Sequence, residues 1–277
     1  MKNAIALGTF DGVHKGHRAV LDLPCSYRKT AVTFSLPPKA VLSGEKALIT
    51  TPEDKCRILR NIGVDEILLL DFKEVRDMPP QDFLVFLKEK YNPQLISCGF
   101  NYRFGKNGGG DHNTIKKFCT ENGIEFKITD PVTSGEQVIS STYIRELLKN
   151  GDVESANKLL SEPFSFKAEV IEGDKRGRTI GFPTVNQKYP EELVKLRFGV
   201  YKTKIEYKGK EYFGITDIGI RPTYKLDFII SETYIKNFSG NLYGEELRIT
   251  PLEFLREEVK FSTLEELKKQ ILIDINS

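Results

Sequence analysis

The first half of the chain alternates short apolar runs with amphipathic segments. The apolar runs have the length and composition of strands that are buried on both faces. They cover residues 5–7, 31–34, 67–70 and 95–98. Helical segments lie between them: Thr51-Pro52-Glu53 opens one, with Ile58, Leu59 and Ile62 on one side, and Pro79-Pro80 opens another, followed by Phe83, Leu84, Phe86 and Leu87. Strands that alternate with helices predict a parallel sheet covered by helices on both faces.

Two shorter helices are expected at the end of this half, over residues 141–149 and 153–160. Gly151 lies between them, where a helix C-terminal cap belongs. Beyond Pro163 the pattern changes to β-forming runs separated by turn signals. These runs cover residues 164–170, 199–207, 211–218, 228–235 and 246–251. They predict an antiparallel sheet or a small barrel.

A final helix is expected from Ser262, with Glu265 completing a capping box and with Leu264, Leu267 and Ile271 along one face. The change of pattern near residue 162 predicts two domains, one over residues 1–162 and one over residues 163–277. A chain of 277 residues is long enough for two cores. The expected fold class is therefore an α/β domain followed by a β domain with a C-terminal helix.

Composition narrows the class of protein. Apolar residues make up 39% and charged residues 29%, the balance of a globular protein. A formal net charge of +2 gives no general attraction to nucleic acid or anionic lipid. No apolar stretch approaches the roughly 18 residues of a membrane span, and no signal-peptide pattern is present. The cysteines lack CxxC spacing and are expected to be reduced and mostly buried. We therefore expect a soluble, cytoplasmic protein with no nucleic-acid or membrane partner.

Residues 8–17, GTFDGVHKGH, follow the first strand and lead into a helix. Ligands of open α/β sheets bind at the carboxyl ends of strands, where helix N-termini offer free amides to anions. The glycines at 8, 12 and 16 let the backbone approach an anion, and His14 and His17 add donors that can follow developing charge. The spacing departs from a Rossmann fingerprint and from a P-loop, which favours phosphate binding without hydride transfer. Two alternatives stay open: a polar turn with a helix cap, and a zinc site.

A second hydroxyl-rich string, Ser-Ser-Thr at 140–142, precedes a helix that carries Arg145 one turn inside. Hydroxyls, amides and a guanidinium in this order suit a polyphosphate. An ordinary N-cap explains the same string. Residues 99–106 are compatible with a glycine-rich surface loop or with a ligand-binding loop.

The second half contains a glycine-rich basic segment, GDKRGRTIGFPTVN, at residues 173–186. A flap that covers a nucleotide is favoured, and a solvated basic hairpin or an RNA-contacting loop stays open. Thr184 and Asn186 face the same way on an extended chain, and their oxygens suit Mg²⁺. Phosphoryl transfer to an alcohol also needs a base, for which Glu232 is the candidate. The alternative for Glu232 is a surface position on an edge strand.

Several strings resemble the bacterial bifunctional riboflavin kinase/FAD synthetase family. GTFDGVHKGH is similar to the opening of that family and contains the (H/T)xGH signature of nucleotidyltransferases. Residues 139–145 resemble its (I/V)SSTxxR string, and residues 99–111 resemble its GxDFxFGxxxxGD loop. The riboflavin kinase part of the resemblance rests on strings in the expected order at 173–186, 217–223, 232–235, 241–244 and 255–256.

The resemblance implies a Rossmann-like nucleotidyltransferase domain with a parallel sheet, followed by a small antiparallel β-barrel kinase domain with a C-terminal helix. It implies that riboflavin is phosphorylated to FMN by ATP with Mg²⁺. FMN is then adenylylated by a second ATP to FAD, with release of pyrophosphate. Riboflavin, FMN, FAD and ATP are the implied partners.

The resemblance also implies site residues. For adenylyl transfer, these are catalytic His14 and His17 and the ATP-binding residues Gly8, Phe10, Asp11, Gly16, Ser141, Thr142 and Arg145. The flavin and nucleotide loop supplies Asn101, Arg103, Phe104 and Gly105. For the kinase, Glu232 is the base, and ATP is bound by Gly173, Lys175, Gly177, Gly181, Pro183, Thr184 and Asn186. Thr184 and Asn186 also hold Mg²⁺, and Arg221, Pro222, Thr223 and Arg256 lie on the flavin side.

The chain departs from the family pattern at four points. Ser-Leu-Pro-Pro at 35–38, with Pro37 at the third position, replaces Asp-Pro-His-Pro. Asn101 replaces an Asp, and Val138 replaces a basic residue. Leu-Ser-Glu-Pro at 160–163 stands where Gly-Arg-Pro is usual. Slower adenylyl transfer is expected, but the HxGH core is intact.

Two other functions stay open. One is a kinase whose first domain binds nucleotide without transferring it. The other is a flavin- or RNA-binding regulator built on a kinase fold. The joint presence of Thr184, Asn186 and Glu232 argues against the regulator, because a binding protein does not need a base.

Overall fold

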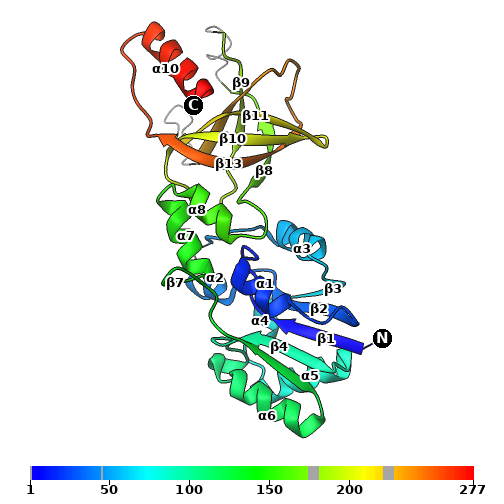
Figure 1. Cartoon of the computed structure of the whole chain (residues 1–277). Helices are drawn as coiled ribbons and strands as arrows, with labels where there is room; N and C mark the ends of the chain where they lie inside the picture. Colours follow the sequence, from blue (N-terminus) through cyan, green and yellow to red (C-terminus); the bar gives the residue numbers. More distant parts are fainter. Residues whose placement is uncertain (1, 45, 174–180, 221–227) are drawn as a thin grey trace. The chain divides into compact units, whose positions relative to one another are not determined.

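The structure is a computed structural model that describes residues 2–44, 46–173, 181–220 and 228–277. The chain folds into two compact units (Figure 1). The first unit consists of Met1–Tyr143 together with Leu159–Glu162, and the second of Ile144–Lys158 together with Pro163–Ser277. The chain therefore crosses between the units more than once near residue 150, where the sequence predicted a single boundary at 162.

The first unit is built on a five-stranded parallel sheet in the order β3-β2-β1-β4-β5. The strands are β1 (Lys2–Leu7), β2 (Tyr27–Phe34), β3 (Glu66–Leu70), β4 (Leu95–Gly99) and β5 (Glu125–Thr129). The central strand β1 pairs with both β2 and β4, so that Leu7 lies beside Val32 and Cys98. The predicted parallel α/β architecture is confirmed. Parallel pairing places the carboxyl ends of all the strands at one edge, where a ligand site is expected.

Helices cover both faces of this sheet. They are α1 (Lys15–Leu21), α2 (Pro38–Ser43), α3 (Pro52–Asn61), α4 (Phe72–Val75), α5 (Pro80–Tyr91) and α6 (His112–Asn122), with a 3-10 turn at Lys106–Gly108. One core contains Leu84 of α5 and Ile115 of α6, and a separate core contains Val20 of α1 and Leu59 of α3. Each fully buried aliphatic side chain contributes about 1.5–3 kcal/mol. The helices predicted to open at 51 and 79 are present, whereas α2, α4, α6 and β5 were not anticipated.

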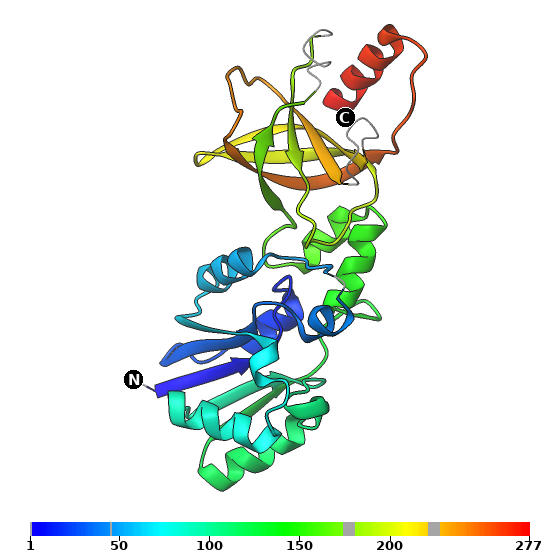
Figure 2. The same cartoon turned by 180° about the vertical axis from the view of Figure 1, so that it is seen from behind.

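The second unit is a closed antiparallel barrel in the order β10-β11-β12-β9-β8-β13 (Figure 2). Its strands are β8 (Phe166–Ile171), β9 (Thr184–Lys188), β10 (Gly199–Tyr207), β11 (Lys210–Ile220), β12 (Ile229–Ile235) and β13 (Glu246–Arg256). The helix α8 (Val153–Leu159) and most of α7 (Ser141–Lys149) precede it, and a hairpin of β6 (Thr133–Ser134) and β7 (Gln137–Val138) belongs to the first unit. The predicted barrel is confirmed.

The barrel interior contains a ladder of threonines across three neighbouring strands. Thr203 and Thr216 lie 2.9 Å apart at their hydroxyl oxygens, as do Thr216 and Thr233. All three side chains are fully buried. Because each hydroxyl can donate and accept, the ladder satisfies polar groups that would otherwise be costly inside a core.

The last helix, α10 (Leu264–Asn276), has its N-cap one residue later than predicted. Its N-cap is Thr263, whose hydroxyl accepts from the Glu266 amide at 3.2 Å, while the Glu266 carboxylate accepts from the Ser262 amide. The expected capping box of Ser262 and Glu265 is therefore wrong by one position. Leu264 is 63% exposed and does not join the inner face.

The cysteines are free thiols, and two of them, Cys98 and Cys119, are buried. Burial raises the pKa of Cys98 to about 12 and that of Cys119 to about 11, so both stay protonated. Cys25 is exposed, against the expectation that most would be buried. None of the helices in the described part of the chain has the length and apolar character needed to cross a bilayer.

Candidate active sites

The turn between β1 and α1 has an unusual backbone. The φ angle is positive at Phe10 (47°), Gly12 (81°) and Val13 (38°). Glycine adopts such angles freely, but a β-branched valine does so only under strain, which the surrounding contacts must stabilise. The turn ends at His14, the N-cap of α1, whose Nδ1 accepts a hydrogen bond from the His17 amide at 3.3 Å. The interpretation of this motif as a helix cap is therefore confirmed for His14.

Asp11 anchors this turn from within. Its carboxylate is only 2% exposed and accepts hydrogen bonds from the amides of Ile49 at 3.0 Å and Thr50 at 3.2 Å. The Thr50 hydroxyl accepts from the Gly12 amide at 3.2 Å. The side chain of Asp11, predicted to bind ATP, is thus directed into the protein and fixes the shape of the turn.

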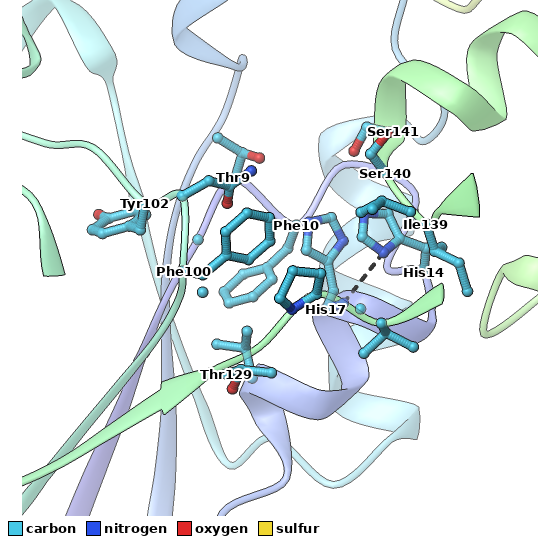
Figure 3. Close-up of a pocket in the computed structure, with 18 of the residues that line it drawn as sticks. Thr9, Phe10, His14, His17, Phe100, Tyr102, Thr129, Ile139, Ser140 and Ser141 are labelled. Atoms are coloured by element: carbon cyan, nitrogen blue, oxygen red, sulfur yellow. Dashed lines mark hydrogen bonds between the residues drawn. The ribbon is translucent and has the colours of Figure 1, made fainter. Parts of the chain in front are cut away.

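The two histidines form a stacked pair. Their ring centroids lie 3.6 Å apart with an interplanar angle of 19°, and the ring of Phe10 meets His17 edge-on at 5.3 Å (Figure 3). Burial, followed by the neighbouring His14 and Lys55, lowers the pKa of His17 well below its usual 6.5, so the ring is neutral at pH 7. Nδ1 of His17 is buried and has no hydrogen-bond partner among the described residues. When His14 is neutral, its proton is on Nε2, because Nδ1 is an acceptor.

A cavity of about 350 Å³ opens beside these histidines at the carboxyl ends of the strands. It is lined by the turn after β1 and by segments that follow β4, β5 and β7. Nine of the predicted residues line it: Gly8, Phe10, His14, Gly16, His17, Asn101, Arg103, Ser141 and Thr142. Segments far apart in sequence therefore meet where the topology of a parallel sheet places a ligand.

The Ser-Ser-Thr string lines the same cavity, with Ser140 and Ser141 beside His14 of the histidine turn (Figure 3). The Ser140 hydroxyl accepts from the Tyr143 amide at 3.2 Å, which is an N-cap contact. The Ser141 hydroxyl donates to the Asp11 carbonyl at 2.9 Å and ties the two strings together. The N-cap explanation is therefore confirmed for Ser140, and polyphosphate binding by this string stays a prediction. Arg145 lies further along α7, in the part of that helix assigned to the second unit.

Phe104 and Gly105, predicted as ligand contacts, have structural positions instead. Phe104 packs in the core beside α5 and α6. Gly105 has a φ of 70°, and a Cβ there would lie 2.8 Å from Pro80, so the chain needs a glycine at this point. The predicted loop extends to Asp111, which caps α6 and accepts from the Thr114 amide at 3.0 Å. That hydrogen bond is the main cause of the lowered pKa of Asp111.

Two residues of this site have no signal in the sequence. Lys55, on α3, is only 2% exposed, and its Nζ donates to the carbonyls of Phe34 and Thr9, the latter at 3.4 Å. Burial lowers the pKa of Lys55. Thr129, at the end of β5, lines the cavity with a buried hydroxyl that has no hydrogen-bond partner among the described residues. A lysine within a helix and a threonine ending a strand are too ordinary to be singled out by pattern.

The barrel has its own polar site on its outer surface. Asn186 of β9 pairs with Glu232 of β12, which pairs with Asp217 of β11. Residues directly opposite on neighbouring strands share one face, so these three side chains form a row. Thr184 lies two residues before Asn186, and its hydroxyl donates a hydrogen bond to Oε1 of Glu232 at 2.6 Å. The structure thus brings together the predicted base Glu232 and the two predicted Mg²⁺ ligands, Thr184 and Asn186.

Gly173 fits closely against Asn186. A Cβ on this glycine would lie 2.3 Å from Nδ2 of Asn186 and 2.6 Å from its Cγ. Asn186 is only 7% exposed, so its amide has little room to move. Gly181 has a φ of 87°, and Pro183 is exposed directly before β9. Lys175, Gly177, Arg221, Pro222 and Thr223 lie outside the described residues.

Beside this row lies a second cavity, of about 280 Å³, which the sequence did not indicate. Its lining includes Lys202, Phe213, Tyr234 and Lys236 from the barrel and Asp274 from α10. Tyr234 is the pairing partner of Thr184, which makes the cavity a neighbour of the polar row. Aromatic and cationic side chains in one hollow suit a flat, polar ring system.

Arg256, predicted on the flavin side, binds the last helix. Its Nε lies 3.1 Å from both carboxylate oxygens of Asp274, and its Nη2 lies 2.7 Å from Oδ2. Nη1 donates to the Glu257 carbonyl at 3.1 Å. The guanidinium therefore holds α10 against the end of β13.

Comparison with known proteins agrees with this division of sites. The family model described as FAD synthetase matches residues 1–143, and the model described as riboflavin kinase matches residues 160–277. The bifunctional riboflavin kinase/FMN adenylyltransferase of Listeria monocytogenes is 36% identical over 98% of this chain and 90% of its own length. The protein of the same description from Bacillus subtilis is 35% identical over 98% and 89%. The chain belongs to the bifunctional riboflavin kinase/FMN adenylyltransferase family. The predicted resemblance is thereby confirmed.

A solved structure shows the same fold over almost the whole chain. The crystal structure described as a macrolide-efflux protein from Streptococcus pneumoniae has a TM-score of 0.90 and 29% identity, covering 99% of this chain and 92% of that one. The FAD synthetase match contains the histidine turn, and the riboflavin kinase match contains Thr184, Asn186 and Glu232. Each polar site therefore lies within the family model of matching chemistry.

Proposed function

We propose that this chain makes FAD from riboflavin in two successive transfers. The barrel unit transfers the γ-phosphoryl group of ATP to riboflavin and gives FMN. The sheet unit then joins FMN to the adenylyl group of a second ATP and releases pyrophosphate. The observation that supports this most directly is that each of the two matched family models contains one built polar site.

For adenylyl transfer, we assign phosphate binding and charge stabilisation to the turn at residues 8–17. A neutral His17 can direct its Nδ1, which has no partner among the described residues, toward a phosphate oxygen. His14 offers its Nε2 proton, and the Ser141 and Thr142 region faces the same cavity. Asn101 and Arg103 contribute on the other side. We assign Asp11, Phe104 and Gly105 a positioning role, because they shape the loops. The side chains that line the cavity hold the FMN phosphate in line with the α-phosphorus of ATP and stabilise the charge that develops there.

For phosphoryl transfer, we assign the base to Glu232. Its carboxylate lies on the open outer face of the barrel, in hydrogen-bond contact with Thr184. A carboxylate there can accept the proton of the terminal ribityl hydroxyl as that oxygen attacks the γ-phosphorus. The neighbouring cavity, with Phe213 and Tyr234, has room for the flavin ring.

Mg²⁺ fits the same row of side chains. The Thr184 hydroxyl donates a hydrogen bond to Glu232 and keeps its lone pairs, and Asn186 presents an amide oxygen fixed by its contact with Gly173. Hard oxygen ligands of this kind suit Mg²⁺, which would neutralise charge on the phosphates. Thr184 and Asn186 are the residues proposed to hold it.

We further propose that residues 1–162 carry adenylyl transfer and residues 163–277 carry the kinase. The reaction needs only small molecules: riboflavin, FMN and ATP. We place it in the cytoplasm, where the free thiols of this chain are kept reduced.

The assay that tests the function supplies the full chain with riboflavin, ATP and Mg²⁺ and follows FMN, FAD and pyrophosphate. Glu232→Gln is expected to lower FMN formation from riboflavin by about 10²-fold or more and to leave FAD formation from FMN intact. His17→Ala is expected to do the reverse, by about 10²-fold. Each variant thus serves as the control for the other. Absence of pyrophosphate release from FMN and ATP at high enzyme concentration would leave the chain a kinase only.

A further inference from the structure

The strained histidine turn is held by contacts from three directions. Asp11 is bound by the amides that precede α3, and Ser141 reaches the Asp11 carbonyl. The remaining contact involves the Val13 carbonyl, which comes directly before His14. It comes from residues 160–162, more than 140 positions later in the chain and beyond the end of the FAD synthetase match at residue 143.

Ser161 binds the Val13 carbonyl, and its two neighbours, Leu160 and Glu162, bind other parts of the first unit. Leu160 forms an isolated antiparallel bridge with His14. Ser161 donates both its amide, at 3.1 Å, and its hydroxyl, at 2.5 Å, to the Val13 carbonyl. Glu162 accepts from Arg57 at 2.7 Å and from Asn61 at 2.9 Å, which fastens the segment to α3.

We propose that Ser161 is a positioning residue for adenylyl transfer, which acts by fixing the Val13 carbonyl and thereby the ring of His14. The inference rests on the proposed function of the histidine turn. Ser161 does not line the cavity, so its effect on substrates is transmitted through the backbone.

The physical reason is the strain at Val13. A valine at a φ of 38° returns toward an extended conformation unless its neighbours prevent it. Two donors on one carbonyl restrain the peptide plane that joins Val13 to His14. If this plane rotates, the His14 ring moves relative to the cavity and its stack with His17 is disturbed. Misplacement of a reacting group by about 1 Å can cost up to about 10²-fold in rate.

The test uses the full chain and two substitutions at one position. Ser161→Ala removes the hydroxyl donor and keeps the amide, and Ser161→Thr keeps both. We expect Ser161→Ala to lower kcat for FAD formation from FMN by about 5- to 20-fold, with the KM for FMN changed by less than about two-fold. Ser161→Thr is expected to retain the wild-type rate. FMN formation from riboflavin, measured on the same protein, is expected to be unchanged.

Thr120→Val is the matched control, because it deletes a hydroxyl that donates to a carbonyl of the same unit, that of Lys116 at 3.0 Å. It is expected to leave both reactions unchanged. The proposal is overturned if Ser161→Ala makes FAD within about two-fold of the wild-type rate, or if Ser161→Thr is as slow as Ser161→Ala. If the alanine variant does not fold, Ser161→Cys replaces it, because a thiol of similar size is a weak donor, and the same direction is expected.

Hydrogen exchange separates this inference from the proposed function. Amides of residues 8–18 are expected to exchange faster in Ser161→Ala than in Thr120→Val. If the wild-type chain makes no FAD but residues 8–18 still exchange faster in Ser161→Ala, the proposed function is refuted and the restraint of the Val13 carbonyl by Ser161 is supported. Unchanged exchange of residues 8–18 in Ser161→Ala refutes this restraint, whatever rate of FAD formation is measured.

Discussion

At the scale of the residue, the proposed kinase site depends on the absence of a side chain at Gly173. The contact between Gly173 and the Asn186 amide leaves no space for a Cβ, which would lie 2.3 Å from Nδ2. We predict that Gly173→Ala displaces Asn186 and lowers FMN formation by about 10-fold or more, because a metal or phosphate ligand is moved by a fraction of an ångström or more. Steady-state kinetics with riboflavin, ATP and varied Mg²⁺ measure this effect, and a raised requirement for Mg²⁺ is expected.

Gly240→Ala is the control for that substitution. A Cβ at Gly240 would meet only the edge of the Phe238 ring, at 3.2 Å. It is expected to leave kinase kinetics unchanged, and FAD formation from FMN should be normal in both variants. Normal kinase kinetics in Gly173→Ala would show that Asn186 is not held by this glycine.

His17 carries a second prediction at this scale, on the pH dependence of stability. Burial, His14 and Lys55 lower its pKa in the folded chain well below 6.5. In the unfolded chain His17 takes up a proton near pH 6.5, whereas in the folded chain it stays neutral at that pH. The free energy of unfolding therefore has its full value above pH 6.5 and falls as the pH drops toward the pKa of His17 in the folded chain. Between pH 7.5 and 5.5 this single group is expected to lower the free energy of unfolding of the first unit by about 1 kcal/mol.

Native-state hydrogen exchange of the buried β1 amides, measured at both pH values, reports on this unit alone. His17→Gln cannot take up the proton and should show a pH dependence smaller by the same amount. An equal pH dependence in the wild type and in His17→Gln would contradict the buried, neutral state of the ring.

At the scale of the element, α10 depends on one buried ion pair. Asp274 is 5% exposed and is bound on two sides by the Arg256 guanidinium, with Gln270 donating at 2.8 Å. Arg256→Met leaves the carboxylate buried without its charge partner, which is expected to cost about 3–5 kcal/mol in the free energy of unfolding of the barrel unit. Urea unfolding followed by circular dichroism measures it.

Arg256→Met combined with Asp274→Leu should recover much of this loss, because removal of both partners leaves no buried charge. Glu265→Gln removes the exposed pair with Lys268 on the same helix and is expected to cost less than about 0.5 kcal/mol. A loss of similar size for Arg256→Met and Glu265→Gln would mean that the ion pair does not hold the helix.

The elements also show what the sequence can and cannot indicate. Apolar runs located the three inner strands β1, β2 and β4, because burial on both faces excludes polar residues there, and they also located the edge strand β3. The helix α6 was missed because Asp111 pairs with Thr114 in its capping box and lies at the end of a glycine-rich loop, so it had the pattern of a loop residue. The start of α10 was misplaced because Ser262 and Thr263 each have a glutamate three residues later.

The same limit applies to the site. The spacing of His14 and His17 identified the turn, since both belong to one short string. The partners of Asp11 lie 38 and 39 positions away, and those of Val13 lie almost 150 positions away. Contacts of this kind are set by the packing of α3 and of residues 160–162 on the sheet, so no local pattern indicates them. A residue that positions another can therefore be recognised only in the folded chain.

At the scale of the whole molecule, the chain passes from one unit to the other three times between residues 143 and 163. Residues 144–158 belong to the barrel unit, and residues 159–162 return to the sheet unit before Pro163 begins the barrel unit again. Asn157 of α8 accepts from the Phe164 amide at 2.8 Å and donates to the Pro251 carbonyl of β13 at 2.9 Å. Helices α7 and α8 are therefore part of the structural support of the barrel, although the riboflavin kinase match begins only at residue 160.

This arrangement predicts how the chain tolerates division. A fragment of residues 163–277 lacks the helices and loses both hydrogen bonds of Asn157. Its free energy of unfolding is expected to be at least about 3 kcal/mol lower than that of residues 144–277, from two hydrogen bonds and the apolar surface that is exposed. Urea unfolding of both fragments measures the difference, and Asn157→Ala in the longer fragment should account for about 1–2 kcal/mol of it. Equal stability of the two fragments would mean that α7 and α8 only connect the units, because a helix pair that contributes to a core cannot be removed without cost.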